Sequence, residues 1–299
     1  MKKVSQKKLE SFQQTIWSYY KKHKRAFPWR EATHYKDLYK ILVSEVMLQQ
    51  TQAGRVVEKY ESFIVRFPDF ASLHAAPLSE VLRLWKGLGY NRRAIALKKI
   101  AQFFVMRGST APLSVDELDA LPSIGPATAA SISAFAWNTP VPFIETNIRR
   151  VFIHFFFRKT APGSVIDASI LPLVEATLPK KFAGTQHSVR EWYYALMDYG
   201  AALKSLEENP NKKSATYRTQ SRFKGSNREV RGAIVAALSE HTDTSTPAPI
   251  SILVATLKKR LVKRLACTSE VVMKNITALE KEGFLVFDRA KKCVSLKNT

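Results

Sequence analysis

The sequence predicts a mainly α-helical protein that ends in a small α+β domain. Three observations lead to this fold class. Residues 5 to 206 show almost unbroken helical periodicity with few strand signals. Residues 205 to 227 are polar, basic and poor in aliphatic side chains, which is typical of a linker. The residues after this stretch show helical patterns followed by two short strand patterns, so a second domain of different class is expected.

Composition limits the class of protein. The chain has 299 residues, 45% hydrophobic and 11% aromatic, which is enough for two domains with cores and argues against disorder. Lys and Arg number 47 against 25 Asp and Glu, and the net charge of +22 indicates a polyanion partner, with nucleic acid as the leading candidate. The N-terminal stretch lacks the apolar core of a signal peptide, and no run of 18 apolar residues occurs, so we expect an intracellular protein with no membrane partner.

The first domain, predicted over residues 1–206, begins with an apolar helical stripe at Leu9, Phe12 and Ile16. Residues 41 to 52, "ILVSEVMLQQTQ", predict a helix in which the single carboxylate, Glu45, lies among apolar side chains. Burying an unpaired ionised carboxylate costs several kcal/mol, so such a group usually takes up a proton. Glu45 is therefore either a partly buried structural acid or a functional proton donor.

The stretch from Leu121 to Ile132, "LPSIGPATAASI", predicts a hairpin of two helices. A Pro-x-x-Gly turn follows a helix for which Ser114 is the expected cap, and a helix of small residues comes after the turn. Free N–H groups at the start of that second helix could bind a DNA phosphate. A turn that binds nothing is the alternative.

The stretch "PFIETNIRRVF", Pro142 to Phe152, places Glu145 where an extended segment enters a helix that carries Arg149 and Arg150. A carboxylate at a helix N-terminus is stabilised as an anion by the helix dipole and the free N–H groups. Capping alone also explains this pattern and is the commoner explanation for an isolated segment.

The C-terminal region is predicted as a linker over residues 207–228 and a winged-helix-like domain over 229–299. In the last helix, Ser269 is the expected N-cap, three apolar residues share one face, and Gly283 fits a left-handed C-cap. The strands "FLVFD" and "CVSLK" are joined by a basic turn. The alternative is a small α+β cap without a role in DNA binding.

Taken together, these stretches resemble the helix-hairpin-helix superfamily of DNA base-excision glycosylases, and within it the adenine glycosylase (MutY) branch. The resemblance covers residues 27 to 203 and implies a two-lobed helical glycosylase domain. It rests on six strings in order: "FPWR", "SEVMLQQTQ", "LWKGLGYNRRA", "LPSIGPATAASI", "NIRRV" and "ALMDYGA".

The resemblance implies roles for individual residues. Glu45 would protonate the departing base, and Glu145 with Asn147 would stabilise the cation-like sugar. The flipped base would lie against Trp29, Arg30, Leu48 and Tyr194. Gln50 and Tyr90 would enter the base stack, although Trp29 and Tyr90 could also be ordinary core aromatics. The full set of expected DNA contacts is Gln49, Gln50, Thr51, Tyr90, Ser123, Ile124, Gly125, Ala127, Thr128 and Arg149.

Four positions depart from the family pattern. Glu145 stands where the family usually has Asp, which moves the carboxylate by about 1.5 Å. Ser123 replaces a turn glycine, and so strains any turn that needs positive φ. Ala127 stands where some relatives have a Schiff-base lysine, so strong lyase activity is not expected. Tyr194 replaces Gln or Glu, and this leaves the identity of the base open: adenine opposite G or 8-oxoguanine, or alternatively thymine or uracil in mispairs.

The largest departure concerns cofactors. Family members usually hold a [4Fe–4S] cluster through four cysteines, but here Lys204 occupies the first position and the only cysteines are Cys267 and Cys293. We expect no iron–sulfur cluster and no metal, with the basic segment Lys212 to Lys224 either contacting phosphates or acting as a solvated linker. The C-terminal domain does not resemble the Nudix-like domain of MutY enzymes.

The expected partner is double-stranded DNA that contains a mispaired or damaged base. We expect a monomer that is cytoplasmic and nucleoid-associated if the source is bacterial or archaeal. The alternative from another class is a catalytically inactive DNA-binding module.

Overall fold

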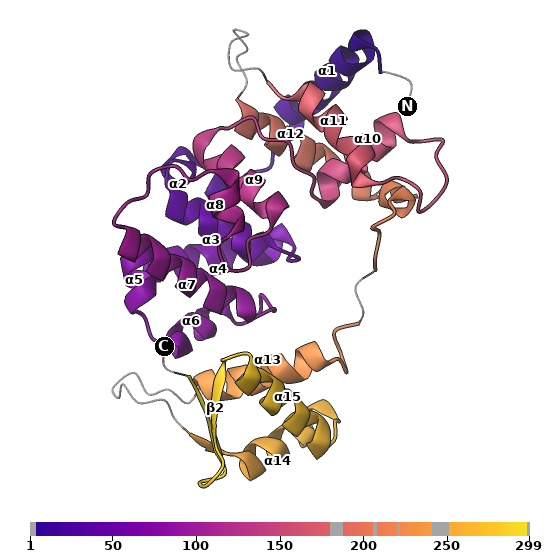
Figure 1. The fold of residues 1–299 in the computed structure, drawn as a ribbon. Coiled ribbons are helices and arrows are strands. Elements are labelled where there is room, and N and C mark those ends of the chain that lie inside the picture. The colour runs from indigo at the N-terminus through magenta and orange to yellow at the C-terminus, as the bar shows by residue number, and fades with distance from the viewer. Residues whose placement is uncertain (1–3, 180–187, 206–207, 220–221, 241–250, 298–299) are drawn as a thin grey trace. The chain divides into compact units, whose positions relative to one another are not determined.

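The fold was analysed in a computed structural model that describes residues 4–179, 188–205, 208–219, 222–240 and 251–297 (Figure 1). It is mainly helical with a small C-terminal sheet, as the sequence predicts. Contacts divide the chain into two compact units, each built from two separate stretches. Unit 1 comprises Met1–Glu45 and Ala111–Thr219, and unit 2 comprises Val46–Thr110 and Gln220–Thr299.

Unit 1 is built around helix α12, which packs against α1, α9 and α10. The predicted stripe of α1, Leu9, Phe12 and Ile16, is buried, and the Phe12 ring lies 5.2 Å from that of Phe152 and 6.0 Å from that of Trp192. The helices of unit 1 are α1 (Gln6–His23), η1 (Pro28–Arg30), α2 (Ala32–Tyr35), most of α3 (Leu38–Leu48), α8 (Val115–Asp119), α9 (Pro126–Trp137), α10 (Thr146–Phe156), α11 (Asp167–Thr177), α12 (Val189–Ala202), η2 (Leu203–Ser205) and η3 (Pro210–Lys213).

Helices α8 and α9 form the predicted hairpin. Ser114 caps α8 in a capping box with Glu117, and Gly125 precedes Pro126, the first residue of α9. Ser123 has φ of +60° in the turn, the left-handed conformation that the sequence indicates and that favours glycine. The turn thus keeps its shape despite the serine, at a cost in backbone strain.

Unit 2 consists of the end of α3, four further helices and the C-terminal domain. Phe70 of α5 stacks on Phe104 of α7 with ring centroids 4.3 Å apart, and α13 packs against α6. The elements are α4 (Ala53–Arg66), α5 (Phe70–Ala75), α6 (Leu78–Trp85), α7 (Arg92–Arg107), α13 (Asn227–Glu240), β1 (Ile252–Leu253), α14 (Val254–Leu265), α15 (Ser269–Lys281), β2 (Leu285–Asp288) and β3 (Cys293–Leu296).

The C-terminal elements have the order of a winged helix. Strand β3 lies between β1 and β2, antiparallel to both, and the helices α13, α14 and α15 pack on one another beside this sheet. Gly283 has φ of +80° after α15, as predicted. The predicted cap is wrong by one residue: the hydroxyl of Thr268, not Ser269, accepts the N–H of Val271 at 3.3 Å.

The domain boundaries at 206 and 229 stay predictions. Positions 207, 220 and 221 of the predicted linker, and 241–250, 298 and 299 of the predicted C-terminal domain, lie outside the described residues. The described part of the linker includes η3, which packs against α10. No helix in the described part of the chain has the length and hydropathy needed to cross a membrane.

Candidate active site

Glu45 lies in α3, whose N-terminus is capped by Asp37 through the N–H of Tyr39 at 2.9 Å. Its helix neighbours are among the most buried residues of the chain: Ile41, Leu42, Val43, Ser44, Val46 and Met47. Burial raises the pKa of Glu45 to about 7, a hydrogen bond from Ser131 opposes the rise, and the charge of Glu145 adds to it. A carboxyl group with a pKa of about 7 is about half protonated at neutral pH. The role of Glu45 as a proton donor stays a prediction.

Ser131 of α9 is the partner of Glu45. Its Oγ lies 2.5 Å from Glu45 Oε2 and 2.9 Å from the carbonyl oxygen of Thr128. A hydroxyl has one hydrogen to donate. When Glu45 is ionised, Ser131 donates that hydrogen to the carboxylate. When Glu45 is protonated, Ser131 donates to the carbonyl oxygen of Thr128 and accepts a hydrogen bond from the Glu45 acid. Sequence reasoning missed Ser131, for which the only signal is a polar residue in a helix of small apolar ones.

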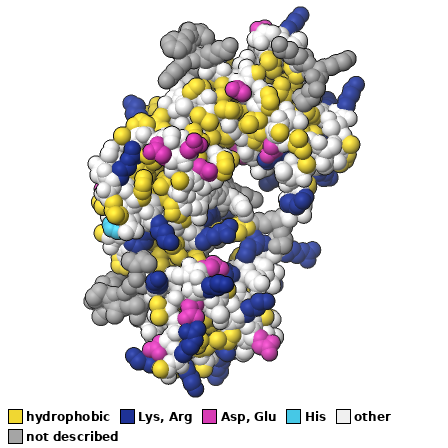
Figure 2. Space-filling view, in the orientation of Figure 1, with side chains coloured by type: hydrophobic (Ala, Val, Ile, Leu, Met, Phe, Trp, Pro, Cys, Tyr) yellow, Lys and Arg dark blue, Asp and Glu magenta, His cyan; other side chains and the backbone are white. Residues whose placement is uncertain are grey.

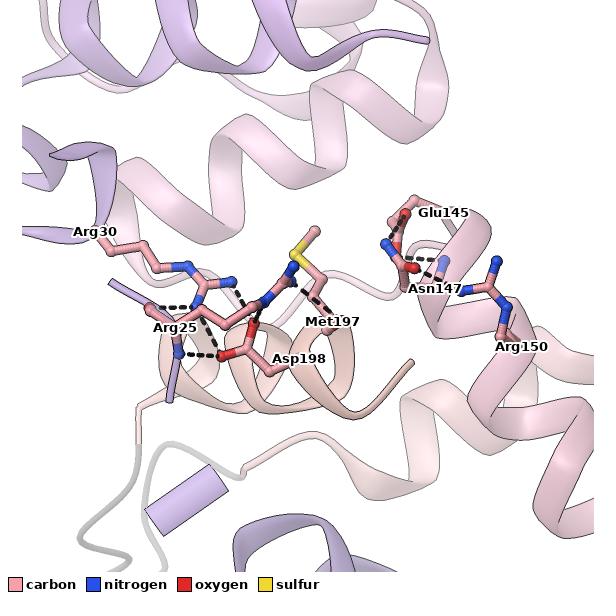
Figure 3. A network of polar contacts seen from close by, with 7 residues as sticks. All are labelled: Arg25, Arg30, Glu145, Asn147, Arg150, Met197 and Asp198. Atoms are coloured by element: carbon pink, nitrogen blue, oxygen red, sulfur yellow. Dashed lines mark hydrogen bonds and ion pairs between the residues drawn. The ribbon is translucent and has the colours of Figure 1, made fainter. Parts of the chain in front are cut away.

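Glu145 caps α10 with its own side chain. Its Oε1 accepts the N–H of Asn147 at 2.7 Å, and its Oε2 accepts Nδ2 of Asn147 at 3.2 Å (Figure 3). Oε1 also accepts the N–H of Ile148 at 2.8 Å. Burial raises the pKa of Glu145, whereas the two backbone N–H groups and the cations Arg150 and Arg149 lower it. The longer side chain therefore still reaches the capping position, and these donors limit the rise that burial causes.

Arg150 and Gly200 hold Asn147 in place. The guanidinium of Arg150, itself 5% exposed, donates to Asn147 Oδ1 at 2.8 Å and to the carbonyl oxygen of Gly200 at 2.6 Å. A Cβ atom at Gly200 would lie 2.3 Å from the carbonyl oxygen of Asn147, so only glycine allows α12 to approach α10 this closely. Sequence reasoning assigned neither role, although both residues lie within the quoted motifs.

The predicted base-pocket residue Arg30 is bound to a buried carboxylate. Its two terminal nitrogens lie 2.9 Å from the two oxygens of Asp198, which is fully buried and also accepts Nε of Arg25 at 2.6 Å (Figure 3). The guanidinium stacks over the ring of Tyr194 at 4.4 Å. Asp198 thus fixes the orientation of Arg30, a role that sequence reasoning did not assign.

Two polar atoms at this position have no hydrogen-bond partner among the described residues: Arg30 Nε and Tyr194 Oη, both buried. Burial raises the pKa of Tyr194, Arg30 and Arg190 lower it, and the nearby Glu45 raises it. Tyr194 therefore lies within electrostatic reach of Glu45, and its place in a base pocket stays a prediction. Trp29 is buried and stacks on Phe27 at 4.9 Å, which is compatible with either a pocket or a core role.

Arg93 organises the predicted DNA-contacting loops of unit 2. Gln50 and Tyr90 both have positive φ, +53° and +47°, so each loop carries a strained non-glycine residue. The buried guanidinium of Arg93 binds both loops, and although burial lowers the pKa of Arg93 to about 10, it stays cationic at neutral pH. Its acceptors are the carbonyl oxygens of Val46, Met47, Gln49, Leu88 and Gly89 and the hydroxyl of Thr51. Sequence reasoning missed Arg93.

The predicted site residues fall into two groups. Unit 2 contains Leu48, Gln49, Gln50, Thr51 and Tyr90; unit 1 contains Glu45, Glu145, Asn147, Trp29, Arg30, Tyr194, Arg149 and the hairpin residues Ser123, Ile124, Gly125, Ala127 and Thr128. Arg149 forms two 2.7 Å bonds to Asp167. Its predicted contact with DNA would have to compete with this ion pair, and it stays a prediction.

Comparisons with known proteins show the family of this chain. Residues 43–170 match the family model of the HhH-GPD superfamily base excision DNA repair protein. The adenine DNA glycosylase of Mycolicibacterium smegmatis is 33% identical over 255 residues, which cover 80% of this chain and 84% of that protein. The chain belongs to the HhH-GPD superfamily of base excision DNA repair proteins.

Other members differ in length and in the base they are named for. The adenine DNA glycosylase of Buchnera aphidicola (subspecies Baizongia pistaciae) is also 33% identical, over 67% of this chain, but the chain spans only 54% of its length. A solved thermostable thymine-DNA glycosylase superimposes with a TM-score of 0.57 at 26% identity, covering 69% of this chain and 92% of that one. Membership of the superfamily therefore does not by itself identify the base that the protein would release.

The donor atoms of this chain do not fit the iron–sulfur cluster that the family resemblance implies. A [4Fe–4S] cluster takes four thiolates, and the sequence has two cysteines, Cys267 after α14 and Cys293 in β3. Among the described residues, no group of three or more His, Cys, Asp or Glu side chains could hold a metal ion.

The segment that follows η2 forms a polar clasp on α10 instead. We use this name for Asn209 and Asn211. Asn211 is buried and donates to the carbonyl oxygen of Thr146 at 3.0 Å, and Asn209 accepts Nε of Arg150 at 3.3 Å. Lys213 donates to the carbonyl oxygen of Thr160, so it is engaged within the protein. The clasp thus touches the helix turn that carries Glu145 and Asn147.

Proposed function

We propose that this protein is a monofunctional DNA glycosylase that releases adenine mispaired with guanine or 8-oxoguanine. The observation that carries the proposal is Glu45: its helix neighbours are buried apolar residues, desolvation raises its pKa to about 7, and the charge of Glu145 adds to that rise. Two carboxyl groups in unlike environments, one on each side of a reacting bond, form the recurring arrangement for cleaving glycosidic bonds. Similarity to adenine glycosylases supports adenine as the base.

In the proposed reaction, Glu45 gives its proton to the flipped adenine as the bond between the base and C1′ of the sugar breaks. Both bonding electrons leave with the base, so the sugar becomes cation-like. The carboxylate of Glu145 stabilises this charge. A water molecule then adds its hydroxyl to C1′, and its remaining proton passes to the ionised Glu45, which restores the acid. Asn147, Arg150 and Gly200 act on Glu145 by holding its helix turn, and so they are positioning residues.

Recognition of the base requires polar atoms that can bond its edge after it has left the stack. Arg30 Nε offers a donor, and Tyr194 Oη offers a donor or an acceptor; neither has a partner within the described protein. Gln50 and Tyr90, on the two loops joined by Arg93, would fill the space that the base leaves. This assignment supports a pocket that selects its base by hydrogen bonds.

The proposal includes several negative features. With alanine at position 127 there is no lysine there to form a Schiff base, so strand cleavage should be weak. We also propose that the enzyme works without an iron–sulfur cluster, as a monomer, on chromosomal DNA in the cytoplasm. Purified protein should then be colourless, contain no stoichiometric iron and stay active in chelator. About four irons per chain would refute the clusterless proposal.

A second candidate is a thymine or uracil glycosylase for mispairs with guanine. Two observations favour it: the similarity to a thymine-DNA glycosylase structure, and the phenol of Tyr194 where adenine glycosylases have an amide or carboxylate. Single-turnover release from duplexes with A, T, U or hypoxanthine opposite G, C or 8-oxoguanine separates the candidates. Release of adenine alone supports the proposal, and release of thymine or uracil alone supports the second. No release from any duplex would indicate an inactive DNA-binding module.

A further inference from the structure

In the winged-helix domain the most basic helix is α14, not the helix that would be expected to enter a DNA groove. In helix-turn-helix proteins the second helix of the motif usually enters the major groove, which would be α15 here. Helix α15 has two acids and two lysines and so no net charge. The acids at its end are also engaged: Glu280 binds Arg289 of the hairpin at 3.0 Å, and Glu282 binds Arg231 of α13.

Helix α14, in contrast, has five cations and no acid among its twelve residues. Val254, Leu257 and Leu261 are buried against the domain. The four residues on the opposite side are exposed and form what we call the α14 strip: Lys259, Arg260, Lys263 and Arg264. Figure 2 shows Lys and Arg side chains at the surface of this C-terminal part of the chain, where Figure 1 labels α14.

The α14 strip concentrates positive charge on one face of the helix. Residues four apart on a helix lie on the same face, so Lys259 repels Lys263. The last-turn cations gain from the helix dipole, but the first two of the strip do not lie in that turn. A row of phosphates along the strip would turn this repulsion into attraction, and duplex DNA supplies such a row.

We propose that the C-terminal domain binds duplex DNA through the α14 strip and the phosphate backbone, and that α15 does not read bases. Lys and Arg contacts to phosphates fix a protein on DNA without conveying sequence. Such binding suits a repair enzyme whose target can occur in any sequence. The inference rests on the proposed function only in taking DNA as the partner, and it adds a second contact surface outside the glycosylase site.

The test uses two charge-matched variants of the full chain. One neutralises the α14 strip by changing Lys259, Arg260, Lys263 and Arg264 to Gln. The other removes four charges from α15 and the hairpin turn by changing Lys274, Lys281, Lys291 and Lys292 to Gln. Fluorescence anisotropy with an undamaged labelled duplex gives the slope of log affinity against log salt for each. Because each phosphate contact contributes about −0.9, the α14 variant should flatten the slope by about 3 to 4 and the control by less than about one.

Other outcomes overturn the inference. Equal flattening in both variants would show a non-specific effect of net charge, and flattening in the control alone would make α15 and the hairpin the DNA-binding face. Unchanged slopes in both would show that neither surface contacts DNA. Circular dichroism checks that both variants are folded. Base release by the wild type is measured separately, and a wild type that releases no base would refute the proposed function without affecting the slopes.

Discussion

Replacing Ser131 by Ala tests how Glu45 keeps its proton. Among the residues that the structure describes, the hydroxyl of Ser131 is the one group that lowers the pKa of Glu45 against the effect of burial. Without it, the ionised carboxylate loses a charge-assisted hydrogen bond, and the neutral acid loses a weaker one. The variant should therefore hold its proton to higher pH than the wild type.

The size of the effect follows from the environment of Glu45. With an ordinary pKa of 4.5, about 0.3% of the carboxyl groups would be protonated at neutral pH, whereas a pKa of about 7 leaves about half protonated. A hydrogen bond to a charged group contributes about 1.5–3 kcal/mol and one to a neutral group about 0.5–1.5. The difference, about 1–1.5 kcal/mol, corresponds to a rise of about one in the pKa.

The assay is single-turnover base release across pH, with each rate divided by its low-pH plateau. The wild type should lose activity with a midpoint near pH 7, the pKa of Glu45. Ser131→Ala should move the midpoint to about pH 8, which makes the normalised rate there about five times that of the wild type.

Ser133→Ala is the matched control. Ser133 lies in the same helix and is as buried as Ser131, 3% against 4% exposed, but it is not among the groups that shift the pKa of Glu45. Superimposed profiles for wild type and Ser131→Ala would refute the reasoning. Equal shifts in both variants would show that packing, and not the hydrogen bond, sets the pKa.

Three further predictions use other parts of the site. Glu145→Gln should slow base release at least about 100-fold by removing the charge that faces the sugar. Glu145→Asp should also slow release, because its carboxylate lies about 1.5 Å further back. Faster release by the Asp variant than by wild type would contradict the second expectation. Gly200→Ala should lower the free energy of unfolding by about 1–3 kcal/mol in thermal or denaturant unfolding, because its Cβ would overlap Asn147. Gly232→Ala is the control and should not destabilise the fold, because a Cβ there would meet no atom of another segment within 4 Å in the described part of the chain. Glu45→Gln should gain stability relative to wild type as pH rises from about 5 to about 8. The pKa of Glu45 in the folded state lies above its ordinary value, so ionisation of Glu45 between about pH 5 and 8 destabilises only the wild type. A difference in melting temperature between the two proteins that does not change with pH would count against this prediction.

Local pattern was enough to predict the fold class and the apolar surroundings of Glu45. Apolar neighbours desolvate a carboxylate, so a raised pKa is expected from the sequence even though the Glu45 side chain is only partly buried. The hairpin was predictable for the same reason, because capping and turn residues act within a few positions of one another. Even the error at α15 is local: Thr268 and Ser269 are adjacent hydroxyl residues with similar capping preference, and pattern cannot choose between them.

Contacts between distant segments were not predictable in this way. Ser131 lies 86 positions from Glu45, and Arg93 lies more than 40 positions from the α3 carbonyl groups that it binds. Gly200 is needed because α12 meets α10 at that residue, and nothing near it in the chain reveals which helix it will touch. Such roles depend on how helices pack, which neither residue preference nor periodicity specifies.

The charge of Glu145 acts on Glu45 as well as having a proposed role beside the sugar. It raises the pKa of Glu45, so the anion that would stabilise the sugar also helps to keep the proton on the acid. Loss of activity in Glu145→Gln therefore combines two effects: the missing charge beside the sugar and a proton donor with a lower pKa. A lower midpoint in the pH profile of that variant measures the second effect, and the loss that remains at the low-pH plateau measures the first.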